Sequence, residues 1–217
     1  MAVVPAYNEE KTIGSVARSL FNQVDKIVVV DDGSTDQTAE IARVAGAIVL
    51  RHKLNRGQGA ALQTGHDFAV QLGADYVLDF DADGQFSVED IAPAFAALKK
   101  SAADILFGSR FLDNRTKMPC LKKYFILPLA RFFNHFFAGV KLTDAHNGFR
   151  ILNNQALRKI SITQDRMAHN TEIPAQVKKH DLKYLEFPVQ VVYREYGQGM
   201  GGGVKIVKDL LIGRFTK

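Results

Sequence analysis

Short runs rich in β-branched residues alternate with longer amphipathic patterns along the first half of the chain. The short runs predict strands at residues 2–6, 26–31, 47–51, 75–80 and 104–111, and the longer patterns predict helices at 9–21, 35–45, 59–72 and 88–100. Regular alternation of strand and helix is typical of βαβ units, which build a mostly parallel sheet flanked by helices. A chain of 217 residues, 47% of them hydrophobic, is long enough to bury one such core. We therefore expect a single α/β domain.

The second half of the chain follows a less regular plan. Its pattern predicts a turn at 144–148, a strand at 149–152, a helix at 171–180, a strand at 183–193 and a glycine-rich loop at 197–203. No internal repeat and no linker separates it from the first half. It is therefore expected to extend the same domain.

Polar residues cluster directly after four of the expected strands. The clusters lie at residues 5–9, 31–34, 81–85 and 108–110. In an open α/β sheet, ligands bind beyond the carboxyl ends of the strands. These clusters are therefore the first candidates for a binding or catalytic site.

The third cluster carries two carboxylates, Asp81 and Asp83, followed by Gly84 and Gln85. Residues two apart in extended backbone point to the same side, so both carboxylates can share one ligand. Carboxylate and amide oxygens suit hard cations such as Mg²⁺ or Mn²⁺, which commonly complete their coordination with water and substrate phosphates. The structural alternative is an ordinary acid-glycine turn. We favour a metal site because two further polar clusters precede this one in the chain.

The second cluster begins with two consecutive carboxylates, Asp31 and Asp32, after an apolar run at 27–30. Ser34 and Thr35 are good N-cap residues, and capping explains part of this cluster without any ligand. Capping does not explain both carboxylates. Asp32 is therefore our candidate for accepting hydrogen bonds from a ribose or a base edge.

Two common nucleotide-binding motifs are missing from the sequence. Residues 57–59 read Gly-Gln-Gly, but Leu62 stands where the dinucleotide fingerprint needs a small residue, and the run does not follow the first strand. No Gly-x-x-x-x-Gly-Lys-Ser/Thr run occurs either. Neither a Rossmann dinucleotide site nor a P-loop is expected, and residues 55–57 are interpreted as the start of a helix near the nucleotide.

The polar clusters, in this order, resemble the motifs of inverting family-2 glycosyltransferases of the A-type fold. The similar runs are Val-Val-Pro-Ala-Tyr-Asn-Glu-Glu at 3–10, Val-Asp-Asp-Gly-Ser at 30–34 and Asp-Ala-Asp-Gly-Gln at 81–85. Runs at 108–111, 144–150 and 193–196 are similar to acceptor-side elements of the dolichol-phosphate mannose synthase-like and bacterial polyprenyl-phosphate branch. The resemblance covers nearly the whole chain. It implies one domain, with a nucleotide-sugar-binding half at 1–111 and an acceptor-side half at 112–217.

The resemblance also implies a role for each motif residue. Pro5, Tyr7, Glu9 and Asp32 would hold the nucleoside, Asp81 and Ala82 would lie along the donor, and Asp83 with Gln85 would ligate Mg²⁺ or Mn²⁺. Arg110 and Arg194 are the implied phosphate binders. Because guanidinium groups match phosphate geometry, Arg131 joins them as a candidate for an acceptor phosphate.

The implied reaction is metal-dependent, inverting transfer of a sugar from a GDP- or UDP-sugar to a polyprenyl phosphate or a glycan, in cell-envelope polysaccharide or glycolipid synthesis. A phosphate acceptor is already ionised, whereas a sugar hydroxyl needs a general base, for which Asp144 is the first candidate and Glu172 the second. The predicted catalytic residues are Asp83, Arg194 and Asp144. The alternative is a non-catalytic subunit that binds a nucleotide sugar or a lipid for a larger synthase.

A basic and aromatic segment follows the first half. Residues 110–131 hold six Lys or Arg residues against the single acid Asp113, and a helix predicted from Pro128 carries phenylalanines on its apolar face. Together with a second amphipathic stretch at 204–215, this predicts peripheral contact with an anionic membrane. A solvated loop and a helix that covers the core are the structural alternatives.

The expected location is the cytoplasm, at the cytoplasmic face of the membrane. The lone Cys120 has no partner for an intramolecular disulfide, and no apolar run is long enough to span a bilayer. No nucleic-acid partner is expected. A homodimer or a membrane-protein partner is left open.

Overall fold

The computed structural model describes residues 1–113, 115 and 140–192. Within them, seven strands form one sheet in the order β3-β2-β1-β4-β6-β5-β7. The strands are β1 (Ala2–Ala6), β2 (Ile27–Asp31), β3 (Ile48–Arg51), β4 (Tyr76–Asp79), β5 (Ile105–Ser109), β6 (Arg150–Asn153) and β7 (Tyr184–Pro188). All the strands run parallel except β6, which is antiparallel to both of its neighbours, β4 and β5.

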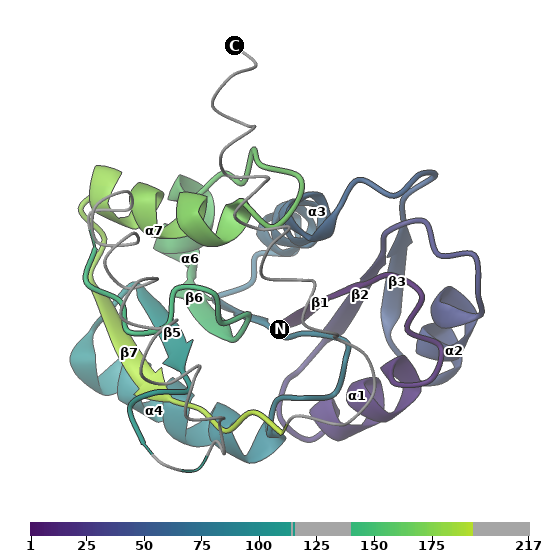
Figure 1. Ribbon diagram of the computed structural model, residues 1–217, viewed down its shortest axis with the longest axis horizontal. Coiled ribbons are helices and arrows are strands. Elements are labelled where there is room, and N and C mark those ends of the chain that lie inside the picture. Colours follow the sequence, from purple (N-terminus) through teal and green to yellow (C-terminus); the bar gives the residue numbers. More distant parts are fainter. Residues whose placement is uncertain (114, 116–139, 193–217) are drawn as a thin grey trace, which may run out of the picture.

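Helices cover both faces of the sheet (Figure 1). The helices are α1 (Ile13–Leu20), α2 (Thr38–Val44), α3 (Gln58–Gln71), α4 (Ile91–Ser101), α6 (Asn154–Lys159) and α7 (His169–Lys179), and a short 3-10 helix, η1 (Val88–Asp90), precedes α4. Apolar residues of α1, α2 and α4 belong to one core, and those of α3, α6 and α7 belong to the other. The strands alternate between these cores, because Val4 packs in the first and Val3 in the second. Burial on both faces explains why β1 and β2 are nearly continuous apolar runs.

Strand β1 lies at the point where the order of the sheet reverses. It pairs with β2 on one side and with β4 on the other, both parallel, in the registers Val4↔Val29 and Val3↔Asp79. The chain winds from β1 outward to β3 and then returns to β4. A crevice beyond the carboxyl ends of strands at such a reversal is the usual ligand site of an open α/β sheet.

The predicted α/β domain with a mostly parallel sheet is confirmed. Two helices begin later than predicted: α1 begins at Ile13 and α2 at Thr38. The polar residues before each helix form loops instead, because they bond to one another across the two clusters. The strand predicted at 183–193 ends at Pro188, and an isolated bridge joins Phe86 to Val191. The sequence pattern missed α6, a six-residue helix that Asn153 caps by accepting from the Ala156 amide.

Several predicted features lie outside the described residues. They are most of the basic segment with the helix from Pro128, the glycine-rich loop at 197–203 and the stretch at 204–215. Among the residues that the structure describes, no helix is long and apolar enough to cross a membrane.

Candidate functional site

A pocket of about 370 Å³ opens at the carboxyl ends of β1, β2 and β4. Its lining includes seven of the predicted site residues, namely Pro5, Tyr7, Glu9, Asp32, Asp81, Ala82 and Asp83. Gln58, Ala61 and Met167 also line it, although no sequence motif indicates them. A larger cavity of about 990 Å³ lies at the amino ends of β1, β2 and β4, next to Met1, Lys26 and Tyr76. No residue of the four polar clusters lines it. The smaller pocket is therefore the candidate site.

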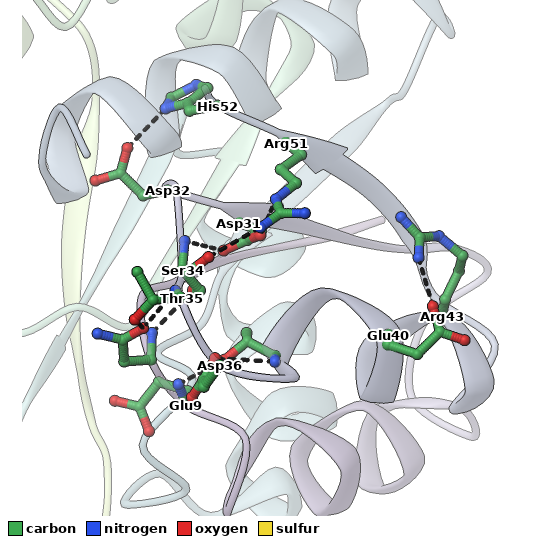
Figure 2. A network of polar contacts seen from close by, with 12 residues as sticks. Glu9, Asp31, Asp32, Ser34, Thr35, Asp36, Glu40, Arg43, Arg51 and His52 are labelled. Carbon is green, nitrogen blue, oxygen red and sulfur yellow. Dashed lines mark hydrogen bonds and ion pairs between the residues drawn. The ribbon is translucent and has the colours of Figure 1, made fainter. Parts of the chain in front are cut away.

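Asn8 ties the loop after β1 to the loop after β2. Its backbone amide donates to Oγ of Ser34 at 2.9 Å, and its Oδ1 accepts from the Thr35 amide at 3.0 Å. Its φ of +56° lies in the left-handed region, which Asn adopts more readily than most residues. The next residue, Glu9, donates its amide to Oγ1 of Thr38 at 2.7 Å. Figure 2 shows the contacts that join these two loops.

Asp31 has a structural role. Its side chain is fully buried, with Oδ1 accepting from the Ser34 amide at 2.9 Å and Oδ2 lying 3.0 Å from Nε of Arg51 (Figure 2). These contacts close the turn after β2 and join it to the end of β3. The first of the two consecutive carboxylates is therefore explained without a ligand.

Asp32 organises the wall of the pocket. Its Oδ1 accepts from Nδ1 of His52 at 2.7 Å and from the Arg56 amide at 3.0 Å, and its Oδ2 accepts from the Gly57 amide at 2.6 Å. The side chain is buried but lines the pocket. Asp32 therefore holds the loop before α3 against the end of β2.

Glycine is required at position 57 of this loop. Gly57 has a φ of +107°, and a Cβ there would lie 2.5 Å from the carbonyl oxygen of Asp165. The N-terminus of α3 is also bonded to this neighbouring loop, because the Ala60 amide donates to the same carbonyl at 3.1 Å. The loop that contributes Met167 to the pocket is thereby packed against α3.

The acidic turn lies on the opposite wall. Oδ1 of Asp81 accepts from Nε2 of Gln58 at 2.8 Å, and Oδ1 of Asp83 accepts from the Gln85 amide at 2.9 Å. Burial and the charge of Asp83 raise the pKa of Asp81 to about 7, although Arg150 opposes this shift. Gly148 packs against the same carboxylate, because a Cβ there would lie 2.3 Å from Oδ2 of Asp81. Two crowded carboxylates facing a pocket suit a divalent cation, which would relieve their repulsion.

No group of three or more His, Cys, Asp or Glu side chains that could hold a metal occurs in residues 1–113, 115 and 140–192. A cation at the acidic turn would therefore depend on few protein ligands. Of the predicted pair, Asp83 lines the pocket, whereas Gln85 does not.

A buried group of charged residues lies beside the acidic turn, at the end of β4. Oδ1 of Asp79 lies 2.7 Å from Nε2 of His66, and Nη2 of Arg150 donates to Oδ1 of Asn170. Burial lowers the pKa of Arg150, while the charges of Asp79, Asp81 and Asp144 oppose the shift. The sequence motif grouped Arg150 with the acceptor side, but the structure buries its side chain as a counter-charge to these carboxylates.

Two residues predicted for the acceptor side bind each other. Nε and Nη2 of Arg110 donate to the two carboxylate oxygens of Asp144, each at 2.7 Å, and the Arg110 amide donates to Oδ2 at 3.1 Å. Asp144 is buried, with only 4% of its surface exposed. Glu186 in β7 fixes the preceding residue, because its Oε1 accepts from the Thr143 amide at 2.6 Å. Neither Arg110 nor Asp144 lines the pocket.

Glu172, the second candidate for a general base, and two histidines lie away from the pocket. Glu172 accepts hydrogen bonds from the amides of Thr163 and Gln164 and so holds the loop before α7. His169 donates from Nδ1 to the Arg166 carbonyl at 2.6 Å, and burial lowers its pKa to about 4. His146 is on the turn after Asp144, and desolvation lowers its pKa.

The remaining phosphate binders are not placed. Arg131 and Arg194 lie outside the described residues. The Val192 amide, close to Arg194 in the chain, donates to the Gln85 carbonyl at 2.9 Å. Arg115, from the basic segment, is bound to Asp90 and Asp113, each at 2.6 Å.

The protein-family model described as "Glycosyl transferase family 2" matches residues 1–161 of the chain. The chain belongs to glycosyl transferase family 2. The predicted family and fold are therefore confirmed, and the chain is a glycosyltransferase. This assignment disfavours the alternative of a non-catalytic subunit.

The names of two relatives of this glycosyltransferase refer to a dolichyl or polyprenol phosphate. It is 33% identical over 226 residues to the UDP-N-acetylglucosamine–dolichyl-phosphate N-acetylglucosaminyltransferase of Methanococcus voltae, covering 94% of this chain and 90% of that protein. It is 25% identical over 218 residues to the polyprenol monophosphomannose synthase of Mycolicibacterium smegmatis, covering 95% and 82%. Both names fit the polyprenyl-phosphate branch that the sequence motifs resemble.

A solved structure confirms the fold of this family-2 glycosyltransferase. Glucosyl-3-phosphoglycerate synthase from Mycobacterium tuberculosis, in complex with Mn²⁺, uridine diphosphate and glucosyl-3-phosphoglycerate, superposes with a TM-score of 0.70. The match covers 97% of this chain and 76% of that one, at 17% sequence identity. At this identity the likeness shows the fold alone.

Proposed function

We propose that the chain catalyses metal-dependent, inverting transfer of a sugar from a nucleotide-diphosphate sugar to a polyprenyl phosphate. The observation that carries the proposal is the single pocket that collects Tyr7, Asp32, Asp81 and Asp83 at the reversal of the sheet. The names of the relatives support a lipid phosphate as acceptor. A product in cell-envelope polysaccharide or glycolipid synthesis follows from that acceptor.

The donor would lie between the two walls of the pocket. Pro5, Tyr7, Glu9 and Asp32 would hold the nucleoside on one wall, and Asp81 with Ala82 would lie along the donor on the other. A UDP-sugar is supported by the name of the Methanococcus relative, and a GDP-sugar is the second candidate.

Mg²⁺ or Mn²⁺ would be held by Asp83 and Gln85. When bound, the metal would neutralise charge that builds on the leaving diphosphate as the anomeric bond breaks. A neighbouring structure that contains Mn²⁺ together with uridine diphosphate supports a divalent cation. Asp83 is the predicted catalytic residue at this position, and Arg194 is proposed to assist the same oxygens.

The acceptor phosphate would bind to Arg110, Arg131 and Arg194. Only Arg110 is described, and Asp144 holds its guanidinium in a fixed orientation through two hydrogen bonds. A phosphate nucleophile is already ionised and needs no general base. Asp144 could serve as a base for a glycan hydroxyl only after releasing Arg110, so the geometry favours the phosphate acceptor.

The remaining proposals rest on sequence alone. They are the division into a donor half and an acceptor half, a cytoplasmic location, peripheral contact with an anionic membrane, and a homodimer or membrane-protein partner. Co-sedimentation of the purified chain with anionic vesicles at low salt tests the membrane contact. Failure to co-sediment would contradict it.

A thermal-shift panel tests the donor class directly. The purified chain would be heated with UDP- and GDP-sugars, each with and without Mn²⁺. We expect stabilisation by at least one nucleotide sugar that is larger with the metal, because a ligand that binds only the folded state raises its stability. Equal melting temperatures under all conditions would contradict a nucleotide-sugar donor.

A further inference from the structure

One side chain of the pocket lining comes from the second half of the chain. Met167 lies in the loop at 160–168, directly before α7, and lines the pocket together with Gln58 and Ala61 of α3. Every other described residue of the lining lies between residues 5 and 83. The division of the chain into a donor half and an acceptor half therefore gives Met167 no role in this pocket.

Met167 presents apolar surface to the pocket. It is 48% exposed, close to the 47% of Tyr7, and among the described residues these two are the large hydrophobic side chains of the lining that remain exposed. A single exposed methionine is ordinary on a protein surface. In a pocket, however, a ligand that covers such a side chain removes apolar surface from water and gains affinity.

Two glycines let the loop at 160–168 lie directly on the first turn of α3. A Cβ at Gly57 would lie 2.5 Å from the carbonyl oxygen of Asp165, and a Cβ at Gly59 would overlap the carbonyl oxygen of Gln164. The Ala60 amide donates to the Asp165 carbonyl at 3.1 Å. The segment that leads to Met167 is therefore packed closely against α3.

Hydrogen bonds hold the same loop from both sides. The Ile162 amide donates to Oε1 of Gln63 in α3 at 2.5 Å, and Glu172 in α7 accepts from the next two amides of the loop. The Asn170 amide donates to the carbonyl of Met167 itself at 3.2 Å. The backbone of Met167 is thus fixed between α3 and α7, which preorganises the side chain for a ligand.

We propose that Met167 is a donor-binding residue that packs its thioether against the nucleoside of the nucleotide sugar. The inference rests on the proposed nucleotide-sugar donor. A diphosphate with its metal presents charged, hydrated surface, whereas a base and its ribose present carbon atoms that an apolar side chain can cover. The loop of Met167 packs on Gly57, whose amide binds Asp32, the candidate nucleoside contact. Because methionine is flexible and polarizable, the contact suits uracil and guanine alike.

Oxidation of the methionines tests the contact in the wild-type chain. Hydrogen peroxide converts an accessible methionine to its sulfoxide, and mass spectrometry of the peptides gives the rate at each position. Met167 should be oxidised several-fold more slowly when UDP and Mn²⁺ are bound. Met1 lines the cavity at the amino ends of the strands and should be oxidised at an unchanged rate. Equal rates at Met167 with and without saturating UDP would overturn the inference.

Variants of Met167 identify the part of the ligand that it covers. Binding of UDP, GDP and pyrophosphate would be measured by titration calorimetry in Mn²⁺. Met167→Ala should weaken each nucleotide that the wild-type chain binds by about fivefold, since covering half of a methionine side chain changes affinity by about that factor. Pyrophosphate should stay within about twofold of its wild-type affinity, because it presents no apolar surface.

Two further variants serve as controls. Met167→Leu keeps an apolar side chain of similar volume and should bind the nucleotides nearly as the wild-type chain does. Leu72→Ala removes a side chain that is 43% exposed at the end of α3, outside the pocket, and should leave all three ligands unchanged.

The outcomes separate the inference from the proposed function. Unchanged nucleotide binding in Met167→Ala would overturn the inference and leave the proposed donor intact. Equal weakening of pyrophosphate would assign Met167 to the diphosphate and overturn the nucleoside contact. If Met167→Ala does not fold, the oxidation rates of the wild-type chain decide. A folded wild-type chain that binds neither nucleotide would overturn the proposed function together with the inference.

Discussion

The surroundings of Asp81 disfavour the ionised form of its carboxyl group. Burial and the neighbouring Asp83 raise its pKa to about 7, far above the value of about 3.9 in an unfolded chain. The folded state therefore binds the proton more tightly than the unfolded state does. The free energy of unfolding should fall as pH rises from about 4 to about 7 and remain low above that range.

Asp81→Asn should remove this pH dependence and stabilise the metal-free chain at pH 8. The amide keeps an oxygen for the Gln58 bond but carries no charge. Each kcal/mol recovered should raise the melting temperature by about 2–4 °C in a chain of this length. Melting curves from pH 5 to 8 check this, and a variant that melts at or below the wild-type temperature at pH 8 would contradict it.

Arg150 should be the most sensitive buried residue beside the pocket. The residue is 1% exposed, and its positive charge offsets the charges of Asp79 and Asp81. Arg150→Met should lower the free energy of unfolding by about 3–5 kcal/mol, because removing one member of a buried charged group leaves the others uncompensated. Urea unfolding measures this loss.

The double variant Asp79→Asn/Arg150→Met is the matched control. It removes one of the uncompensated charges while leaving an oxygen near His66. The double variant should be more stable than Arg150→Met alone. Additive losses in the two single variants would show that Arg150 and Asp79 do not interact.

The helices and strands differ in how far their sequence determines them. Buried strands such as β1 are uninterrupted apolar runs, so their positions were predictable from pattern alone. The loops before α1 and α2 were mistaken for helix, because Asn8 and Ser34 bond across two segments that are 26 residues apart in the chain. The antiparallel direction of β6 could not be predicted either, since a strand pattern carries no direction.

The site residues divide in the same way. Tyr7, Asp32 and Asp83 were predictable because each follows a strand, and the sheet brings strand ends together. His52 lies beside Asp32 and Thr64, which are 20 and 12 residues away in the chain. Met167 enters the pocket from a loop that is also distant in sequence. Both placements depend on contacts between segments that are distant in the chain, so neither could be predicted from the local sequence.

Asp144 on the turn at 144–148 binds Arg110, which directly follows β5. If Asp144 orients Arg110 for an acceptor phosphate, Asp144→Asn should raise KM for the acceptor by about tenfold with little change in kcat, because a charge-assisted bond contributes about 1.5–3 kcal/mol. Steady-state kinetics with a polyprenyl phosphate check this. A loss of kcat by orders of magnitude, with an altered pH profile, would make Asp144 the general base instead.

At the scale of the whole molecule, the order of the sheet creates the site. The chain passes from β1 to β3 on one side and returns to β4 on the other, so the clusters after β1, β2 and β4 meet around one pocket. The same arrangement places Asp83 and Asp32 on the lining of one pocket. A metal at Asp83 is therefore the central claim about the function.

The most direct test is the rate of sugar transfer from a UDP- or GDP-sugar to a polyprenyl phosphate at saturating Mn²⁺. Asp83→Asn should lower this rate by about a thousandfold or more while the chain keeps its melting temperature, because the variant loses metal stabilisation of the leaving diphosphate. Asp67→Asn, at an exposed position on α3, is the matched control and should transfer at the wild-type rate. A folded Asp83→Asn variant that transfers sugar within about tenfold of the wild-type rate would contradict the metal assignment.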